Sequence, residues 1–141
     1  MKIRVCCVGR IRDRNTKSAC EELLLRLAPY RVELIEIKDS KTDAEYEAIK
    51  SQVKAGDYVI ALDAAGKQLS SEEFSEFLSK TDRNIAFVIG GPEGLSKKLL
   101  TEADERLSLS RMTFVHETAR LMLLEQIYRA FMIKENRPYN K

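Results

Sequence analysis

The segment Val88–Lys98 reads VIGGPEGLSKK and decides the fold, because an apolar run ends abruptly in a glycine-rich turn. A short apolar run followed by a turn and a helix-forming stretch is typical of a buried parallel strand in an α/β protein. Ligands of open α/β sheets bind beyond the carboxyl ends of the strands, so a binding loop is expected at this turn. A tight turn without a ligand is the alternative.

The chemistry of the turn restricts the ligand. Gly90, Gly91 and Gly94 allow a close approach to the backbone, and Pro92 stiffens the loop. The phosphate-binding patterns GxxxxGKS, GxxxxGKT and GxGxxG are absent, and Glu93 puts negative charge where a phosphate needs positive charge. The turn therefore favours a neutral or cationic ligand.

Strand and helix patterns alternate along the rest of the chain. Strands are predicted at Lys2–Gly9, Val32–Ile37, Tyr58–Asp63 and Ile85–Gly90, with a fifth short strand within Leu107–Phe114. Helices are predicted around 19–27 and 44–53, from Ser70, from Ser96, and from Glu117 to about Lys134. This order predicts an α/β fold with a mainly parallel sheet flanked by helices.

Length and composition exclude several classes of protein. A chain of 141 residues suits one domain, 1–141, and 44% hydrophobic with 33% charged residues is typical of a folded protein. No apolar run approaches the roughly 20 residues of a membrane span, and the N-terminus lacks a signal-peptide pattern, so no membrane contact and a cytoplasmic location are expected. Three cysteines, an odd number, suit buried reduced thiols, and one histidine without a CxxC motif predicts no metal site.

Basic residues gather at the two ends of the chain, although the net charge is only +2. The first 17 residues hold one acidic residue, Asp13, and six basic ones, namely Lys2, Arg4, Arg10, Arg12, Arg14 and Lys17. From Arg111 onward there are six basic residues and three glutamates. These ends form a phosphate-binding surface if they meet in space, and ordinary solvated charge is the alternative.

Two further segments are predicted to border the site. The segment Leu62–Lys67 lies at the end of the predicted strand Tyr58–Asp63. The segment Leu107–Phe114 alternates apolar and small polar residues before the last helix. Three loops at one sheet edge could enclose one small molecule.

Arg120 is the unusual residue of the last helix. At about 100° per residue it shares a face with Leu124, Ile127 and Phe131, and His116 lies one turn before it. Unpaired burial of a guanidinium is costly, so Arg120 is expected to be paired or to serve a site or an interface. It could also reach solvent through its long stem. His116 alone is more often a capping or core histidine than a catalytic one.

Together these residues resemble the small SPOUT-superfamily (RlmH or YbeA-like) methyltransferases, which modify pseudouridine at N3 in large-subunit ribosomal RNA. The resemblance runs from MKIRVCCVGRI through GDYVIALDAAGKQLSSEEF, FVIGGPEGLS and LSLSRMTF to LLEQIYRAFMIKENRPY. Each motif is modest alone, and their order and spacing make the match specific.

The resemblance implies a single-domain SPOUT (α/β-knot) fold with a C-terminal trefoil knot, which general topology rules disfavour. It also implies a homodimer that binds S-adenosyl-L-methionine and acts on large-subunit rRNA in the ribosome. Carried over residue by residue, the cofactor contacts are Leu62, Gly90, Leu109, Ser110, Arg111, Met112, Thr113 and Phe114. A sulfonium cofactor without phosphate agrees with the missing phosphate patterns and with Glu93.

Three positions depart from the family pattern. Thr113-Phe114-Val115-His116 stands where the family usually has TFPH, and Glu117 stands where it usually has glutamine. Tyr139-Asn140-Lys141 replaces the usual Tyr-His-Lys or Tyr-His-Arg. Asn140 can exchange hydrogen bonds, but it cannot titrate near neutral pH as histidine can.

Methyl transfer from a sulfonium needs an in-line ring nitrogen that has lost its proton. Arg120 is the candidate for stabilising the base anion or orienting RNA, Tyr139 for packing around the base, and His116 for removing the proton. Another RNA such as tRNA, or a non-catalytic ribosome-binding dimer, is the alternative function. A flavodoxin-like nucleotide-binding module is disfavoured by the phosphate-hostile turn.

Overall fold

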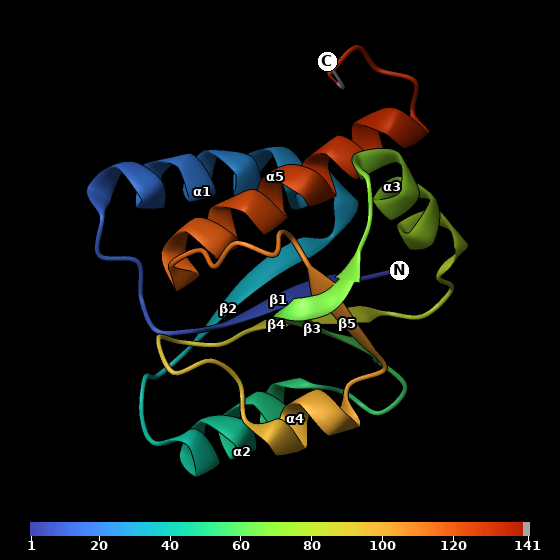
Figure 1. The fold of residues 1–141 in the computed structure, drawn as a ribbon. Coiled ribbons are helices and arrows are strands. Elements are labelled where there is room, and N and C mark those ends of the chain that lie inside the picture. The colour runs from blue at the N-terminus through green and yellow to red at the C-terminus, as the bar shows by residue number, and fades with distance from the viewer. Residues whose placement is uncertain (140–141) are drawn as a thin grey trace.

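The computed structural model describes residues 1–139 and shows a three-layer α/β/α sandwich (Figure 1). Five strands form one sheet in the order β2-β1-β4-β3-β5, and every pair of neighbours is parallel. The strands are β1 (Ile3–Val8), β2 (Val32–Ile37), β3 (Tyr58–Gln68), β4 (Ile85–Ile89) and β5 (Glu105–Ser108). The helices are α1 (Arg14–Leu27), α2 (Thr42–Gln52), α3 (Ser71–Lys80), α4 (Lys97–Glu102) and α5 (His116–Lys134), with a 3-10 turn at Ala28–Tyr30. The predicted α/β class with a parallel sheet is confirmed.

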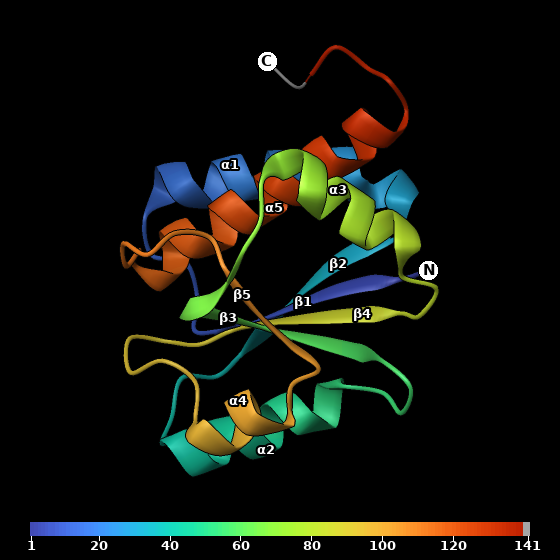
Figure 2. The ribbon, with the colours of Figure 1, turned by 45° about the vertical axis from the view of Figure 1, so that its right-hand side comes forward.

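The two central strands divide the core into two halves. β1 and β4 are buried along their whole length, as parallel strands covered on both faces must be. Successive side chains point to opposite faces, so Cys7 and Phe87 pack under α1, α3 and α5, whereas Cys6 and Val88 pack against α2 and α4. Figures 1 and 2 show these helix layers above and below the sheet.

Three cysteines are free and buried, in agreement with the prediction of reduced thiols. Burial raises the pKa of Cys6 to about 11 and that of Cys7 to about 12, and burial also raises the pKa of Cys20. The thiolate is the reactive form, so these cysteines stay protonated core residues at neutral pH.

Side-chain caps fix several helix starts. Asp13 accepts from the backbone N–H of Thr16 at the start of α1, and Ser96 accepts from Leu99 at the start of α4. Ser70 and Glu73 form a reciprocal capping box before α3, at the helix start that the sequence predicts from Ser70. Each cap satisfies N–H groups that a helix start leaves without a partner.

The prediction for the fifth strand was wrong in its bounds. The strand β5 covers Glu105–Ser108, and residues 109–114 form a loop. Their apolar and polar residues alternate as in a strand, but in the structure these residues belong to a loop that lines a cavity.

The strand β3 continues past Asp63, where the sequence predicts a turn. Its register against β5 shifts between Leu62 and Lys67, which accommodates the extra residues as a bulge. Gly66 permits this contact, because a Cβ there would lie 2.7 Å from the carbonyl carbon of Arg106. The expected wall of the site therefore exists, built by an irregular strand.

No helix of the described residues is long and apolar enough to cross a membrane. No group of three or more His, Cys, Asp or Glu within residues 1–139 could hold a metal ion. The C-terminal knot remains a prediction from the family resemblance.

Candidate functional site

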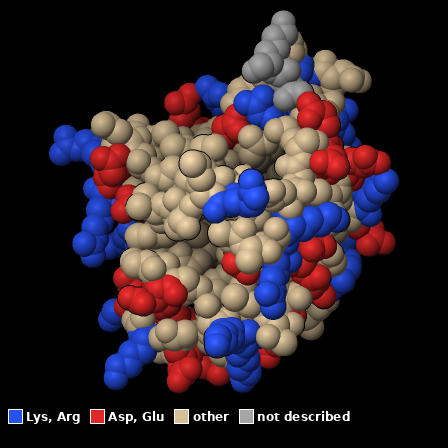
Figure 3. Space-filling view, viewed as in Figure 1, with Lys and Arg blue, Asp and Glu red and all other residues tan. Residues whose placement is uncertain are grey.

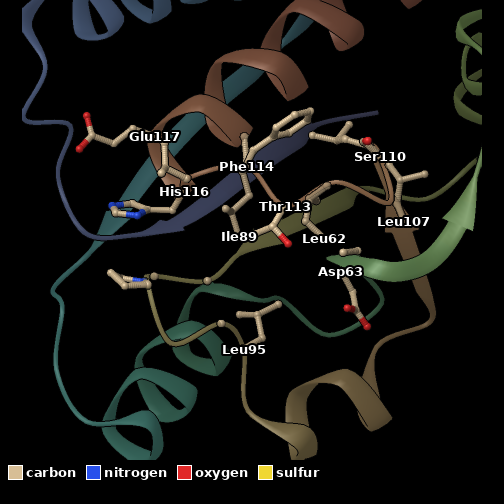
Figure 4. Close-up of a pocket in the computed structure, with 18 of the residues that line it drawn as sticks. Leu62, Asp63, Ile89, Leu95, Leu107, Ser110, Thr113, Phe114, His116 and Glu117 are labelled. Atoms are coloured by element: carbon tan, nitrogen blue, oxygen red, sulfur yellow. The ribbon is translucent and has the colours of Figure 1, made fainter.

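A cavity of about 700 Å³ lies at the carboxyl ends of β4 and β5, beside the bulge of β3 (Figure 4). That volume suits a ligand of cofactor size. Its walls come from the middle of β3 at its bulge, from the turn after β4, and from the chain between β5 and the first turn of α5. In Figure 3 the same face shows a hollow in a mostly uncharged area, with charged side chains around it.

Seven of the eight predicted cofactor contacts line this cavity: Leu62, Gly90, Leu109, Ser110, Met112, Thr113 and Phe114. Arg111 is exposed and is absent from the lining. The three segments that the sequence placed around one small molecule therefore do meet.

The glycine turn is closed by its own backbone. The N–H of Gly94 donates to the carbonyl oxygen of Gly91 at 2.9 Å, and Gly94 has a φ of +75° that favours glycine. A Cβ on Gly90 would lie 2.7 Å from the carbonyl carbon of Gly94 and 2.8 Å from the nitrogen of Leu95. Gly90 is therefore required for the turn to fold back against the end of β4.

Hydrogen bonds within the loop shape the opposite wall. The Ser108 hydroxyl donates to the Ser110 carbonyl at 2.9 Å, and the Met112 N–H donates to the Ser110 hydroxyl at 3.0 Å. These bonds leave the Met112 side chain 77% exposed at the mouth of the cavity. An exposed apolar side chain beside a ligand site can contact a ligand or partner without loss of core packing.

The charged side chains of the lining are acidic. Asp63 and Glu117 line the cavity, and no lysine or arginine does so among the described residues. Asp63 accepts from the N–H of Ala65 and lies 3.9 Å from the guanidinium of Arg106, a loose ion pair. This lining suits a neutral or cationic ligand better than a phosphate.

His116 lies in the lining as the first residue of α5. Its Nε2 is 3.8 Å from the position that a Cβ on Gly9 would occupy, so the ring packs beside the end of β1. The neighbouring Glu117 accepts from the N–H groups of Arg12 and Asp13 at 2.9 and 3.2 Å. Figure 4 labels both side chains on the α5 side of the cavity.

Arg120 is buried and paired, one of the two outcomes expected for it. Its side chain is 1% exposed, its NH1 donates to Glu36 at 2.7 Å, and its NH2 donates to the Gly9 carbonyl at 2.9 Å. Its Nε has no hydrogen-bond partner within residues 1–139. Arg120 is absent from the cavity lining and instead joins α5 to the ends of β1 and β2.

Tyr139 lies outside the cavity formed by its own chain. Its hydroxyl donates to Glu125 at 3.3 Å, and its ring packs edge-to-face on Tyr128 at 4.9 Å between centroids. Glu125 is more than two helical turns beyond His116 along α5. Asn140 and Lys141 lie outside the described residues.

Structure divides the N-terminal basic residues into two groups. Lys2 pairs with Glu33, and Arg4 pairs with Glu33 and Asp57, so both are engaged at the other end of the sheet. The second group, Arg10, Arg12, Arg14 and Lys17, is exposed and makes no ion pair within the described part of the chain. Only this second group is available for a phosphate.

Several lining residues were not singled out as site residues from the sequence, notably Asp63, Ile89, Leu95, Leu107 and Glu117. Asp63 lies within a segment that was expected to form a wall of the site, so its position was a usable signal for a lining residue. Glu117 was noted as a departure from the family pattern but was not assigned to the site.

Fold and cavity together define an α/β protein with a small-molecule site at the carboxyl edge of a parallel sheet. The chain belongs to the SPOUT methyltransferase family, whose model, described as "Predicted SPOUT methyltransferase", matches residues 1–140.

Relatives match along the full chain. A Carboxydothermus hydrogenoformans protein named ribosomal RNA large subunit methyltransferase H is 43% identical, and one of the same name from Clostridium novyi is 42% identical. Each match covers 100% of both chains. A solved structure of a probable methylase family protein from Haemophilus influenzae Rd KW20 superposes with a TM-score of 0.60 at 16% identity, over 99% of this chain and 70% of that one. That last likeness supports the fold alone.

Proposed function

We propose that this chain is an S-adenosyl-L-methionine-dependent RNA methyltransferase that methylates N3 of a pseudouridine in large-subunit ribosomal RNA. The observation that carries the proposal is the cavity at the carboxyl edge of the sheet, lined by apolar and acidic groups, in a chain of the SPOUT methyltransferase family. The names of the full-length relatives support ribosomal RNA as the substrate. A cytoplasmic location follows from that substrate.

The lining fits the proposed cofactor. S-Adenosylmethionine supplies a methyl group on a positively charged sulfonium when it is bound. Gly90 and the loop 109–114 would hold it through backbone groups, since most of their side chains are small or apolar. The absence of cations from the described lining avoids repulsion with the sulfonium.

His116 and Arg120 are assigned to the substrate side in different roles. His116 lines the cavity and is the candidate for accepting the proton of the ring nitrogen. Arg120 is assigned as a positioning residue, because its two amino groups already bind Glu36 and Gly9. Direct contact between its guanidinium and the base remains a prediction.

Methyl transfer to ribosomal particles tests this function. We expect the protein to transfer labelled methyl groups from S-adenosylmethionine to bacterial ribosomes or large subunits, and mapping of the product should place the label at N3 of one pseudouridine. Free ribosomal RNA and tRNA are the comparison substrates. Labelling of tRNA alone would replace this proposal with the tRNA alternative, and binding to ribosomes without any transfer would support the non-catalytic dimer.

We also propose a homodimer in which Tyr139 serves the cavity of the partner copy. Tyr139 contacts Glu125 on its own α5 and is absent from its own cavity lining, so a second copy is the way for it to reach a target base. A twofold arrangement would supply two such sites from one symmetric contact. Light scattering at micromolar concentration should give twice the mass of the chain, and a fully active monomer would contradict the proposal.

A further inference from the structure

The chain between β1 and α1 is held at both ends by the first turns of α5. We name residues 9–14 the basic loop. Arg120 donates to the carbonyl oxygen of Gly9 at 2.9 Å, and the N–H groups of Arg12 and Asp13 donate to Glu117 at 2.9 and 3.2 Å. Residues three apart in a helix are neighbours on its surface, so one side of α5 binds the beginning and the end of the basic loop.

These contacts fix the backbone of the basic loop and leave its cations outside. Glu117 and Arg120 bind only main-chain groups of the loop. The carboxylate of Asp13 accepts from the backbone N–H and the hydroxyl of Thr16 as the cap of α1. The guanidinium groups of the exposed Arg10, Arg12 and Arg14 are therefore presented from a fixed backbone without an acidic partner in the described part of the chain.

The same turn of α5 forms a wall of the cavity. His116 and Glu117 both line it, and His116 packs beside Gly9. Figure 4 shows the Glu117 side chain extending from the rim of the cavity toward the blue segment that connects β1 to α1. Glu117 is therefore in contact with the cavity and with the basic loop at once.

We propose that Glu117 is a positioning residue that holds the basic loop at the rim of the cavity in the geometry that binds RNA phosphates. This inference rests on the proposed function. Two hydrogen bonds to one carboxylate are charge-assisted and stronger than neutral ones. A loop that is ordered before it binds RNA loses less conformational entropy on binding, so the benefit appears as affinity for RNA. A structural bond beside ordinary solvated arginines is the competing explanation.

Filter binding of naked large-subunit ribosomal RNA, without cofactor, separates these explanations. Glu117→Ala should weaken RNA binding roughly tenfold, a loss on the scale of one hydrogen bond to a charged group. The slope of log affinity against log salt should become shallower by up to about 2, because each lost phosphate contact of a single strand removes about 0.7. Glu117→Gln keeps a side-chain oxygen acceptor for both N–H groups, although without the charge, and should restore most of the affinity and of the slope.

Glu22→Ala is the matched control, since it removes one exposed carboxylate of α1, which pairs with Arg26 on the same helix. It should leave RNA affinity and salt slope unchanged. A double-mutant cycle measures the coupling between Glu117 and Arg12. Arg12→Ala should weaken RNA binding less in the Glu117→Ala background than in the unmodified chain.

Amide hydrogen exchange measures the contact itself. The amides of Arg12 and Asp13 should lose protection in Glu117→Ala and keep it in Glu22→Ala. Unchanged RNA affinity and salt slope in Glu117→Ala, or equal weakening by Glu117→Gln, would overturn the inference. Neither readout needs methyl transfer, so a protein that binds RNA through this loop but methylates nothing would disprove the proposed function and leave the inference standing.

Discussion

Gly90→Val is expected to lower the affinity for S-adenosylmethionine by about 100-fold or more, equivalent to about 2.8 kcal/mol of binding free energy. The added Cβ would meet backbone atoms of Gly94 and Leu95 at 2.7 to 3.0 Å, and backbone cannot yield as a flexible side chain can. The turn must move away from the end of β4, and the cavity loses that wall. Because the clash lies in a surface turn, the sheet and its two buried core halves should stay folded.

Calorimetric titration with the cofactor measures this loss, and circular dichroism checks the fold. Gly56→Ala is the control: Gly56 is another turn glycine, with a positive φ of +89°, and no atom lies within 4 Å of its added Cβ. Its strain should cost about 1 kcal/mol or more of stability without any effect on the cofactor. Unchanged affinity in a folded Gly90→Val protein would show that the cofactor binds elsewhere.

Gly90 also shows what a sequence can and cannot establish about a site. The residue types and their place after an apolar strand predicted that this glycine borders a ligand site, and it does line the cavity. Sequence reasoning attributed its importance to close approach of the ligand, whereas its Cβ direction points into the turn itself. The direction of a missing side chain depends on the local backbone, which residue types do not specify.

The fold could be predicted from the sequence where one hydrophobic pattern dominates a segment. The central strands β1 and β4 are apolar throughout because both of their faces are covered, and such runs are easily recognised. Leu107–Phe114 misled the strand prediction because its alternation arises partly from β5 and partly from a loop that lines the cavity. The continuation of β3 depends on Gly66 packing on the backbone near Arg106, a contact between distant segments.

Ion pairs and hydrogen bonds between distant residues could not be predicted either, because only the fold brings their partners together. Arg120 was expected to be paired or functional, but no pattern names Glu36 or Gly9 as its partners across the sheet. Lys2 and Arg4 counted toward a basic end of the chain until their pairing with Glu33 and Asp57 removed them from it. Charge along a sequence becomes a binding surface only through the contacts that the fold allows.

Arg120→Ala and deletion of residues 139–141 are each expected to lower turnover by about 100-fold or more while changing cofactor affinity little, the scale seen when one oriented donor is lost. Arg120 holds the Gly9 carbonyl and Glu36, so its loss should disturb the start of α5, where His116 and Glu117 lie. Truncation of a buried pair also costs about 3 kcal/mol of stability, the lower end of the usual range because Glu36 is 41% exposed. Stability must therefore be measured beside activity.

The tail deletion acts on a different part of the molecule. Tyr139 packs on Tyr128 and Glu125 and lies under the guanidinium of Arg129, so its removal leaves the cavity lining of its own chain intact. Loss of turnover with normal cofactor affinity would then place the tail on the substrate side. Asn140→His, outside the described residues, should be tolerated, and a gain in activity would indicate that a titratable group is useful there.

Glu36→Gln separates the two roles of Arg120. If the guanidinium acts by holding the Gly9 carbonyl and the start of α5, loss of its ionic partner Glu36 should lower turnover in parallel with stability. Arg120→Lys should then retain only part of the rate, because one ammonium cannot reproduce the geometry of two amino groups. If it acts directly on the base, through the Nε that lacks a partner within residues 1–139, Glu36→Gln should free the guanidinium and retain turnover. Single-turnover rates and cofactor titrations on the same variants decide between these roles. A loss of cofactor affinity proportional to the loss of rate in Arg120→Ala would contradict the assignment of Arg120 to the substrate side. A fully active tail deletion would contradict that assignment for Tyr139.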